Sequence, residues 1–130
     1  MSAQIISASE GILTVKIAGQ LTHSELVELQ KQAATFLDSQ EKTAILVVAK
    51  DFQGWAKQGA WGDVSFQVRY DARISRMAIV GHRKWEDVAL VFAAKGVRSF
   101  PIEYFSTDEL AKAHDWLKAA QALGNISARP

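Results

Sequence analysis

The sequence predicts an α/β domain built on a mixed, largely parallel five-stranded sheet with helices on both faces. Two aliphatic runs without alternation, 44–49 and 77–80, are typical of strands buried on both faces, as in a parallel sheet. Helical patterns separate these runs, and helices are the usual connections between parallel strands. The predicted element order is β-β-α-β-α-β-α-β-α. One domain is expected, because 130 residues are enough for one and too few for two.

The first third of the chain predicts a hairpin followed by a helix. Residues 12–17 alternate between apolar and polar side chains, as in a strand with one wetter face. Residues 5–6 belong to a preceding strand across a turn at 10–11. Thr22 and Glu25 have the spacing of a capping box, which predicts the start of a helix. The apolar face expected for this helix consists of Leu26, Leu29, Ala33, Phe36 and Leu37.

The remaining elements continue the alternation of helices and strands. Pro101 cannot donate to a β ladder, which places the last strand, within 97–105, at an edge or a bulge. A second capping box, Ser106 with Glu109, begins the final helix, which is expected to stop at 124–125. The three helices expected in this half cover roughly 56–70, 84–94 and 107–123.

Composition excludes several classes of protein. Fifteen basic and 14 acidic side chains give a net charge of +1, unlike a nucleic-acid binder that relies on a basic surface. The chain has no cysteine and its three histidines are far apart, so we expect no metal site and no cofactor. No apolar run approaches the ~20 residues of a membrane-spanning helix, and no signal pattern begins the chain. We therefore expect a cytoplasmic protein with one domain at 1–124 and a loose tail at 125–130.

The segment 56–70 is apolar on two sides when it is drawn as a helix. The side expected to pack on the sheet carries Trp61, Val64 and Val68. The nearly opposite side carries small and aromatic residues: Gly59, Gly62, Phe66 and Tyr70. Three interpretations of this second side stay open. It packs on a neighbouring helix or a dimer partner, it is a lid that exposes aromatic surface to lipid or an apolar ligand, or it is an ordinary exposed face.

Two further features bear on a membrane. Trp55, at the start of the same segment, fits either an anchor at a membrane interface or a hydrophobic staple that closes the turn. Residues 69–98 contain seven basic and three acidic side chains. This excess suits an anionic membrane surface, and a solvated surface without a partner is the alternative. A peripheral position at the inner face of the membrane is therefore one option for the protein.

The carboxyl ends of the parallel strands are the usual ligand-binding edge of an open α/β sheet. At one of these ends, His82, Arg83 and Lys84 lead into a helix and could receive a phosphate or carboxylate. Asp51 could orient the imidazole of His82 if their strands are neighbours. No serine elbow and no cysteine supplies a nucleophile there, so we expect that the protein is not an enzyme.

A set of short motifs in fixed order resembles one known family. The motifs are Asp51-Phe52-Gln53-Gly54-Trp55, then Trp61, Asp63, Phe66 and Arg69, then Arg76-Met77-Ala78-Ile79-Val80-Gly81, Lys84-Trp85 and Tyr104-Phe105, preceded by Gly19-Gln20-Leu21-Thr22. Together they resemble the SpoIIAA-like family, whose members have the STAS-type or CRAL-TRIO-like fold. The resemblance spans nearly the whole chain, because the element order agrees from the first strand to the last helix.

The resemblance implies two kinds of function. STAS anti-sigma-factor antagonists bind a kinase partner and are switched by phosphorylation of a Ser or Thr at the helix after the third strand. The corresponding segment here, 50–57, has no hydroxyl residue, and the nearest candidate is Ser65. The CRAL-TRIO-like side implies an apolar ligand between helices and sheet, with membrane association.

The sequence therefore predicts a non-catalytic domain that binds an apolar or lipid-like ligand beneath the helix at 56–70. The expected binding residues are Trp55, Trp61, Phe66, Tyr70 and Trp85. The alternative is a protein-interaction module of the STAS type that docks a partner through the same helix without the phosphorylation switch.

Overall fold

The computed structural model describes residues 3–9, 11–39, 42–56, 69–93, 98 and 100–127, with side chains up to residue 119. Its strands are β1 (Ala3–Ser9), β2 (Ile12–Leu21), β3 (Thr43–Trp55), β4 (Ile74–Val80) and β5 (Ile102–Phe105). Its helices are α1 (His23–Ser39), α3 (Glu86–Phe92) and α4 (Leu110–Ser127). Short 3-10 turns at Asp71–Arg73, Arg83–Trp85 and Thr107–Glu109 precede β4, α3 and α4.

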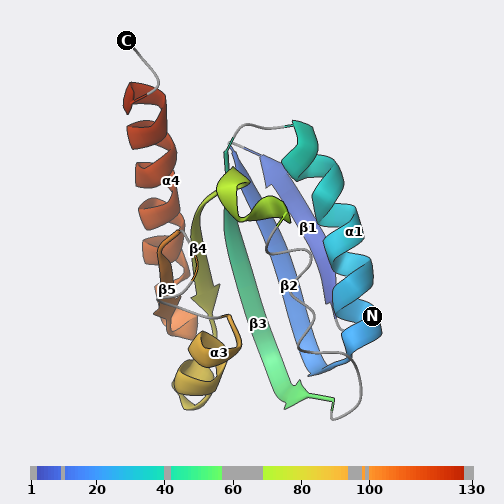
Figure 1. Ribbon diagram of the computed structural model, residues 1–130. Coiled ribbons are helices and arrows are strands. Elements are labelled where there is room, and N and C mark those ends of the chain that lie inside the picture. Colours follow the sequence, from blue (N-terminus) through green and yellow to red (C-terminus); the bar gives the residue numbers. More distant parts are fainter. Residues whose placement is uncertain are drawn as a thin grey trace.

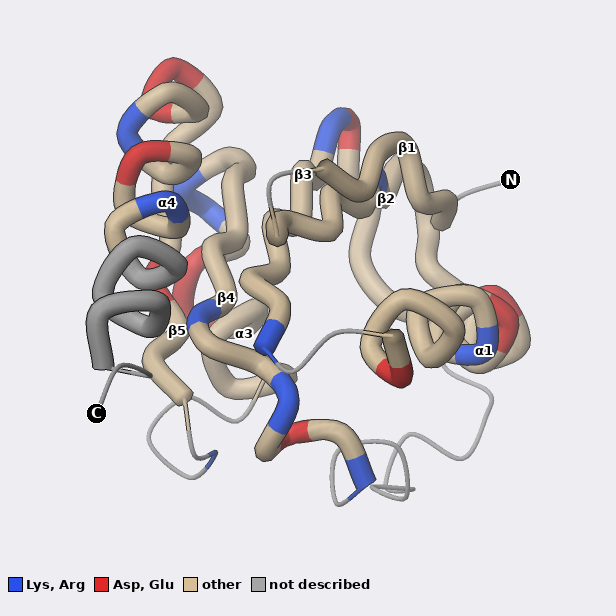
Figure 2. Tube along the Cα trace, turned by 90° about the horizontal axis from the view of Figure 1, so that it is seen from above, with Lys and Arg blue, Asp and Glu red and all other residues tan. Residues whose placement is uncertain are grey.

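The five strands form one mixed sheet in the order β1-β2-β3-β4-β5, which is also their order along the chain (Figure 1). β1 pairs antiparallel with β2, and each later pair is parallel. The predicted α/β fold with a largely parallel five-stranded sheet is therefore confirmed. Figure 2 shows α1 and α4 on opposite sides of this sheet, as expected for helices on both faces.

Alternation along the strands divides the core between the two faces of the sheet. Ala44 and Leu46 of β3 pack with Ala113 and Leu117 of α4 on one face. The other face carries Ile45, which packs in a second cluster with Ile79, Ile102 and Tyr104. A third cluster joins Leu13 and Val15 of β2 to Ala33 of α1. The central strands are thus apolar in both directions, which explains why their sequences show no alternation.

Both predicted capping boxes begin helices. The backbone N–H of Glu25 donates to the Thr22 hydroxyl at 3.2 Å, and this hydroxyl donates to the Glu25 carboxylate at 2.7 Å. At the start of the turn before α4, the Ser106 backbone N–H donates to the Glu109 carboxylate at 2.9 Å. These contacts satisfy donors at helix starts that would otherwise have no partner within the helix.

Several predicted boundaries need correction. The Phe36 side chain is 37% exposed, so the apolar face of α1 is narrower than expected. α4 continues through Gly124 and Asn125 and ends at Ser127. The edge position predicted from Pro101 is confirmed, because β5 is the last strand of the sheet. Pro101 lies just before β5, and its carbonyl accepts a hydrogen bond from the Met77 backbone N–H at 3.0 Å.

The start of the helix predicted at 56–70 differs from the prediction. β3 runs on to Trp55, and the Ala56 backbone N–H donates to the Leu21 carbonyl at 2.8 Å, so no helix begins at 56. Residues 57–68 lie outside the described residues, and only 69–70 are described as helical. Tyr70 was expected to face away from the sheet. It is instead 6% exposed and belongs to the core cluster of Leu37 and Ile74.

Candidate functional site

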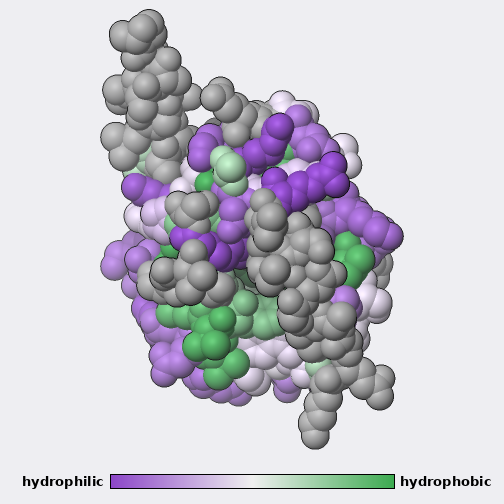
Figure 3. Space-filling model, viewed as in Figure 1, coloured by the Kyte–Doolittle hydropathy of each residue, from purple (hydrophilic) through white to green (hydrophobic). Residues whose placement is uncertain are grey.

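A cavity of about 700 Å³ lies on the face of the sheet that carries α1 and α3. Its floor consists of aliphatic side chains from the central strands: Val15, Ile45, Val47, Met77 and Ile79. α1 lines one side with Leu26, Leu29 and Ala33, and α3 lines another with Ala89 and Phe92. In Figure 3, hydrophobic surface around α3 continues toward the middle of the sheet. The volume lies within the ~300–1,000 Å³ range of small-molecule sites.

Four aromatic rings form a cluster at the carboxyl end of β3. The Phe52 ring lies edge-to-face against Trp55, with centroids 4.9 Å apart, and against Trp85 at 5.1 Å. Trp55 also packs against Phe92 at 4.9 Å and Trp85 at 6.1 Å. Such pairs are stabilising beyond the area that they bury. All four rings line the cavity, so the aromatic cluster forms one of its walls.

The backbone at the carboxyl end of β3 allows the Trp85 ring to lie close to it. Gly54 has φ +96°, and a Cβ at this position would lie 3.3 Å from the Trp85 ring. Asp51, three residues earlier, also has a positive φ, 53°, which is uncommon for a residue with a side chain. These two residues turn the end of the strand so that Phe52 and Trp55 meet Trp85. The Trp55 Nε1 atom is buried there without an acceptor among the described residues.

Polar groups gather at the other end of the cavity, near the start of β4. The Tyr70 hydroxyl donates to Asp38 Oδ2 at 3.3 Å, and the Arg69 guanidinium carbon lies 5.7 Å from the Tyr70 ring centre. Arg98 donates to both carboxylate oxygens of Asp71, with the shortest contact at 2.6 Å. Tyr70, Arg69 and Arg98 all line the cavity.

The structure brings together three of the five predicted binding residues. Trp55 and Trp85 contact each other in the aromatic cluster, and Tyr70 lines the same cavity from its opposite end. Trp61 and Phe66 lie outside the described residues. Phe52 and Phe92 were not predicted as binding residues. Phe92 lies seven residues after Trp85 and three after Ala89, so it shares their side of a helix and could have been found by that spacing.

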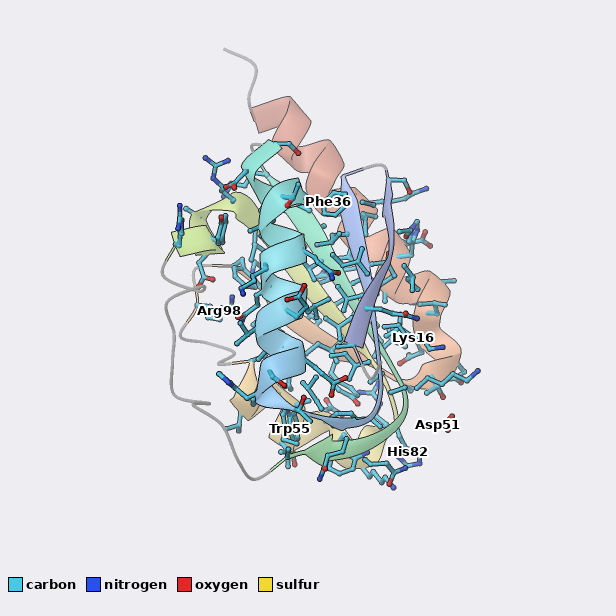
Figure 4. All side chains as sticks on the ribbon, turned by 90° about the vertical axis from the view of Figure 1, so that its right-hand side faces the viewer. Lys16, Phe36, Asp51, Trp55, His82 and Arg98 are labelled. Atoms are coloured by element: carbon cyan, nitrogen blue, oxygen red, sulfur yellow. The ribbon has the colours of Figure 1, made fainter. Side chains whose placement is uncertain are left out.

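The predicted anion-binding residues lie at the carboxyl end of the sheet, where Figure 4 places His82 close to Asp51. Both line a second hollow of about 470 Å³ together with Lys84. The His82 Nδ1 atom accepts a hydrogen bond from the Lys84 backbone N–H at 3.0 Å, which leaves Nε2 to carry the proton of the neutral ring. Lys84 Nζ lies 5.6 Å from the Trp85 ring centre.

Arg83 is already paired within the protein. Its guanidinium donates to Glu86 at 2.8 Å and to Glu109 at 2.9 Å. The hydrogen bond to Glu86 and the charges of both carboxylates raise the pKa of Arg83. Its charge is therefore balanced without a bound anion. Anion binding at these three predicted residues stays a prediction. With Arg83 paired, Lys84 is the cation of this set that could meet an anion.

Tyr104 links this end of the sheet to the cavity floor. Its hydroxyl donates to the His82 carbonyl at 2.8 Å, and its ring lines the cavity. Burial raises the pKa of Tyr104, so the hydroxyl keeps its proton and remains a donor. Among the described residues there is no cluster of three or more side chains that could hold a metal ion, and no helix is long and apolar enough to cross a membrane.

This arrangement of a mixed sheet, flanking helices and an apolar cavity defines a STAS-type α/β domain. The SpoIIAA-like family model matches residues 12–118, and the chain belongs to this family. A solved structure with the same fold is an uncharacterized protein of the DUF3478 family from Shewanella loihica PV-4, described as having a SpoIIAA-like fold. It is 21% identical, with a TM-score of 0.66 over 88% of this chain and 91% of that chain. The comparison with curated proteins gives no match.

Proposed function

We propose that the protein is a non-catalytic domain that binds an apolar or lipid-like small molecule in the cavity between the sheet, α1 and α3. The observation that carries this proposal is the cavity of about 700 Å³ with aliphatic side chains on its floor and aromatic rings at one end. Each 100 Å² of apolar ligand surface removed from water contributes about 2.5 kcal/mol. A ligand that covers the floor thus gains affinity without any specific polar contact.

The chemistry of the lining favours binding over catalysis. Among the described residues, the lining contains no serine, threonine, cysteine or carboxylate, so its one histidine, His23, has none of these usual nucleophiles beside it in the lining to activate. Its phenol groups are already committed, because Tyr70 and Tyr104 donate to Asp38 and to the His82 carbonyl. A retained ligand, rather than a converted substrate, fits such a lining.

The test is a titration with N-phenyl-1-naphthylamine, an uncharged dye that fluoresces in apolar surroundings. We expect saturable binding by the wild type. Val47→Phe, in the middle of the floor, adds volume inside the cavity and should weaken binding at least about tenfold. Val91→Phe is the matched control, because Val91 is 80% exposed on α3 and the same substitution there leaves the cavity unchanged.

Two results of this titration would contradict the proposal. One is the absence of saturable dye binding by the folded wild type. The other is equal binding by the Val47→Phe and Val91→Phe variants, which would place the dye outside the cavity.

A protein-interaction module of the STAS type is the second candidate, and the exposed face of α3 favours it. Val88 is 51% exposed and Val91 is 80% exposed, side by side with the 38% exposed Phe92. Apolar side chains grouped in this way are typical of docking surfaces. In this case Val91→Asp abolishes partner binding and leaves dye binding unchanged, whereas Val47→Phe has the opposite effect.

A further inference from the structure

The charged residues that the structure describes in the lining of the cavity are all of one sign. They are Lys31 on α1, Arg69 before the turn that leads to β4, and Arg98. No aspartate or glutamate is among the described lining residues. An apolar cavity whose described charged residues are all cations is complementary to a ligand that carries negative charge.

Arg98 is not the source of this complementarity, because its charge is already neutralised. Its side chain is only 9% exposed and forms a forked pair with Asp71, with Nη2 to Oδ1 at 2.6 Å and Nε to Oδ2 at 3.1 Å. A second carboxylate at the same guanidinium would bring two negative groups together in a poorly solvated place. The pair of Arg98 and Asp71 therefore closes this end of the cavity instead of binding the ligand.

Arg69 has a different environment. It is exposed, and its guanidinium carbon lies 5.7 Å from the centre of the Tyr70 ring. Stacking on a ring leaves the N–H groups at the edge of the guanidinium able to donate to a carboxylate in the forked geometry that arginine favours. Two acids lie at this end: Asp38 accepts the Tyr70 hydroxyl, and Asp71 is paired with Arg98. Neither is part of the lining. Among the described residues no carboxylate pairs with Arg69.

The cavity has a polar end and an apolar end. Arg69 and Tyr70 lie next to the start of β4, whereas Trp55 lies at the carboxyl end of β3, which runs parallel to β4. The length of β4, seven residues, corresponds to about 20 Å. An extended chain with its charged group at Arg69 would therefore pass over the aliphatic floor and end among the aromatic rings.

We propose that the ligand is an anionic amphiphile, a long-chain carboxylate whose head is bound by Arg69 and whose tail lies along the sheet toward Trp55 and Trp85. This inference rests on the proposed function, since it assigns a chemical class to the ligand of the same cavity.

The test compares three probes with the same tail: tetradecanoate, tetradecanol and tetradecyltrimethylammonium. The two ionic probes are kept below their micelle concentrations and the alcohol below its solubility limit. Each displaces the uncharged dye from the wild type, from Arg69→Gln and from Lys112→Gln. Lys112 is the matched control, because it is 75% exposed on α4, on the opposite face of the sheet. We expect tetradecanoate to bind the wild type about tenfold more tightly than tetradecanol, as is typical of a hydrogen bond to a charged group. Arg69→Gln should remove this preference without changing the affinity for the alcohol.

The outcomes separate this inference from the proposed function. Equal affinities for the carboxylate and the alcohol, or a preference for the ammonium compound, would overturn the anionic class while leaving the apolar site in place. A carboxylate preference that persists in Arg69→Gln, or is lost equally in Lys112→Gln, would overturn the role of Arg69. If neither the dye nor any of the three probes binds the folded wild type, the proposed function itself is overturned.

Discussion

Thr43, the first residue of β3, carries a buried hydroxyl without a hydrogen-bond partner among the described residues. The residue is 3% exposed, so solvent does not replace the missing partner. A buried polar group without a partner costs ~1–3 kcal/mol. Thr43→Val, which keeps the shape of the side chain, should raise the free energy of unfolding by about 1 kcal/mol, measured by urea denaturation. Thr14→Val, at a partly exposed position of β2, serves as the control. A loss of stability in Thr43→Val would contradict the prediction and show that the Thr43 hydroxyl is paired.

Glu109 makes stability depend on pH. Hydrogen bonds from the Ser106 backbone N–H and hydroxyl lower the pKa of Glu109 from 4.5 to about 2. Because the folded-state pKa is depressed, the contribution of the ionised carboxylate is complete above pH 4.5 and is lost as the pH falls toward 2. Glu109→Gln should therefore be less stable than the wild type at pH 7, and the difference should shrink to nothing near pH 2. Urea denaturation of both proteins between pH 2 and pH 7 measures this difference in the free energy of unfolding. A difference that does not change with pH would contradict the prediction.

Individual site residues were predictable only where a local motif fixed them. Trp55 and Trp85 belong to short motifs of the family resemblance, and both line the cavity. The expected orientation of Tyr70, away from the sheet, was wrong, because the Tyr70 ring packs in the core with Leu37 and Ile74. Such long-range packing leaves no periodic signal in the sequence.

At the scale of elements, Gly81 shows how tightly the end of β4 is packed. A Cβ at this position would lie 2.7 Å from the Tyr104 hydroxyl and 3.3 Å from the Ala49 Cβ. Gly81→Ala should therefore displace the Tyr104 ring, break its 2.8 Å hydrogen bond to the His82 carbonyl, and lower the free energy of unfolding by about 1–3 kcal/mol. Urea denaturation gives this value.

A double-mutant cycle identifies the cause of that loss. In a Tyr104→Phe background the hydroxyl is absent, so Gly81→Ala should cost clearly less than in the wild type. An equal cost in both backgrounds would point to Ala49, or to the backbone, as the source.

The existence of the elements was predictable, but their ends were less so. The aliphatic runs at 44–49 and 77–80 and the two capping boxes fixed the strands β3 and β4 and the starts of α1 and α4. The extension of β3 by several residues depends on positive φ angles at Asp51 and Gly54, which no alternation pattern reveals. α4 passes through Gly124 because one glycine costs a helix only about 1 kcal/mol, which does not by itself end it.

For the whole molecule, the two faces of the sheet differ in how the described helices cover them. α4 packs against β3 and β4 through Ala113 and Leu117, which are fully buried. On the opposite face α1 lies over β1 and β2, and α3 lies beside β5, so the cavity floor extends over the strands between them. The element order predicts helices on both faces, but not which helix covers which strands. The spacing between α1 and α3, and hence the cavity, follows from packing that the sequence does not display.

The strands have the same order in the sheet as in the chain, and this has a consequence for folding in the cell. Each strand adds next to the one synthesised just before it, so no early strand waits for a distant partner to leave the ribosome. Because closing long loops slows folding, growth of the sheet from its N-terminal hairpin should keep pace with translation. The N-terminal half can thus acquire ordered structure while α4 is still being made, which shortens the time during which strand edges are exposed to aggregation.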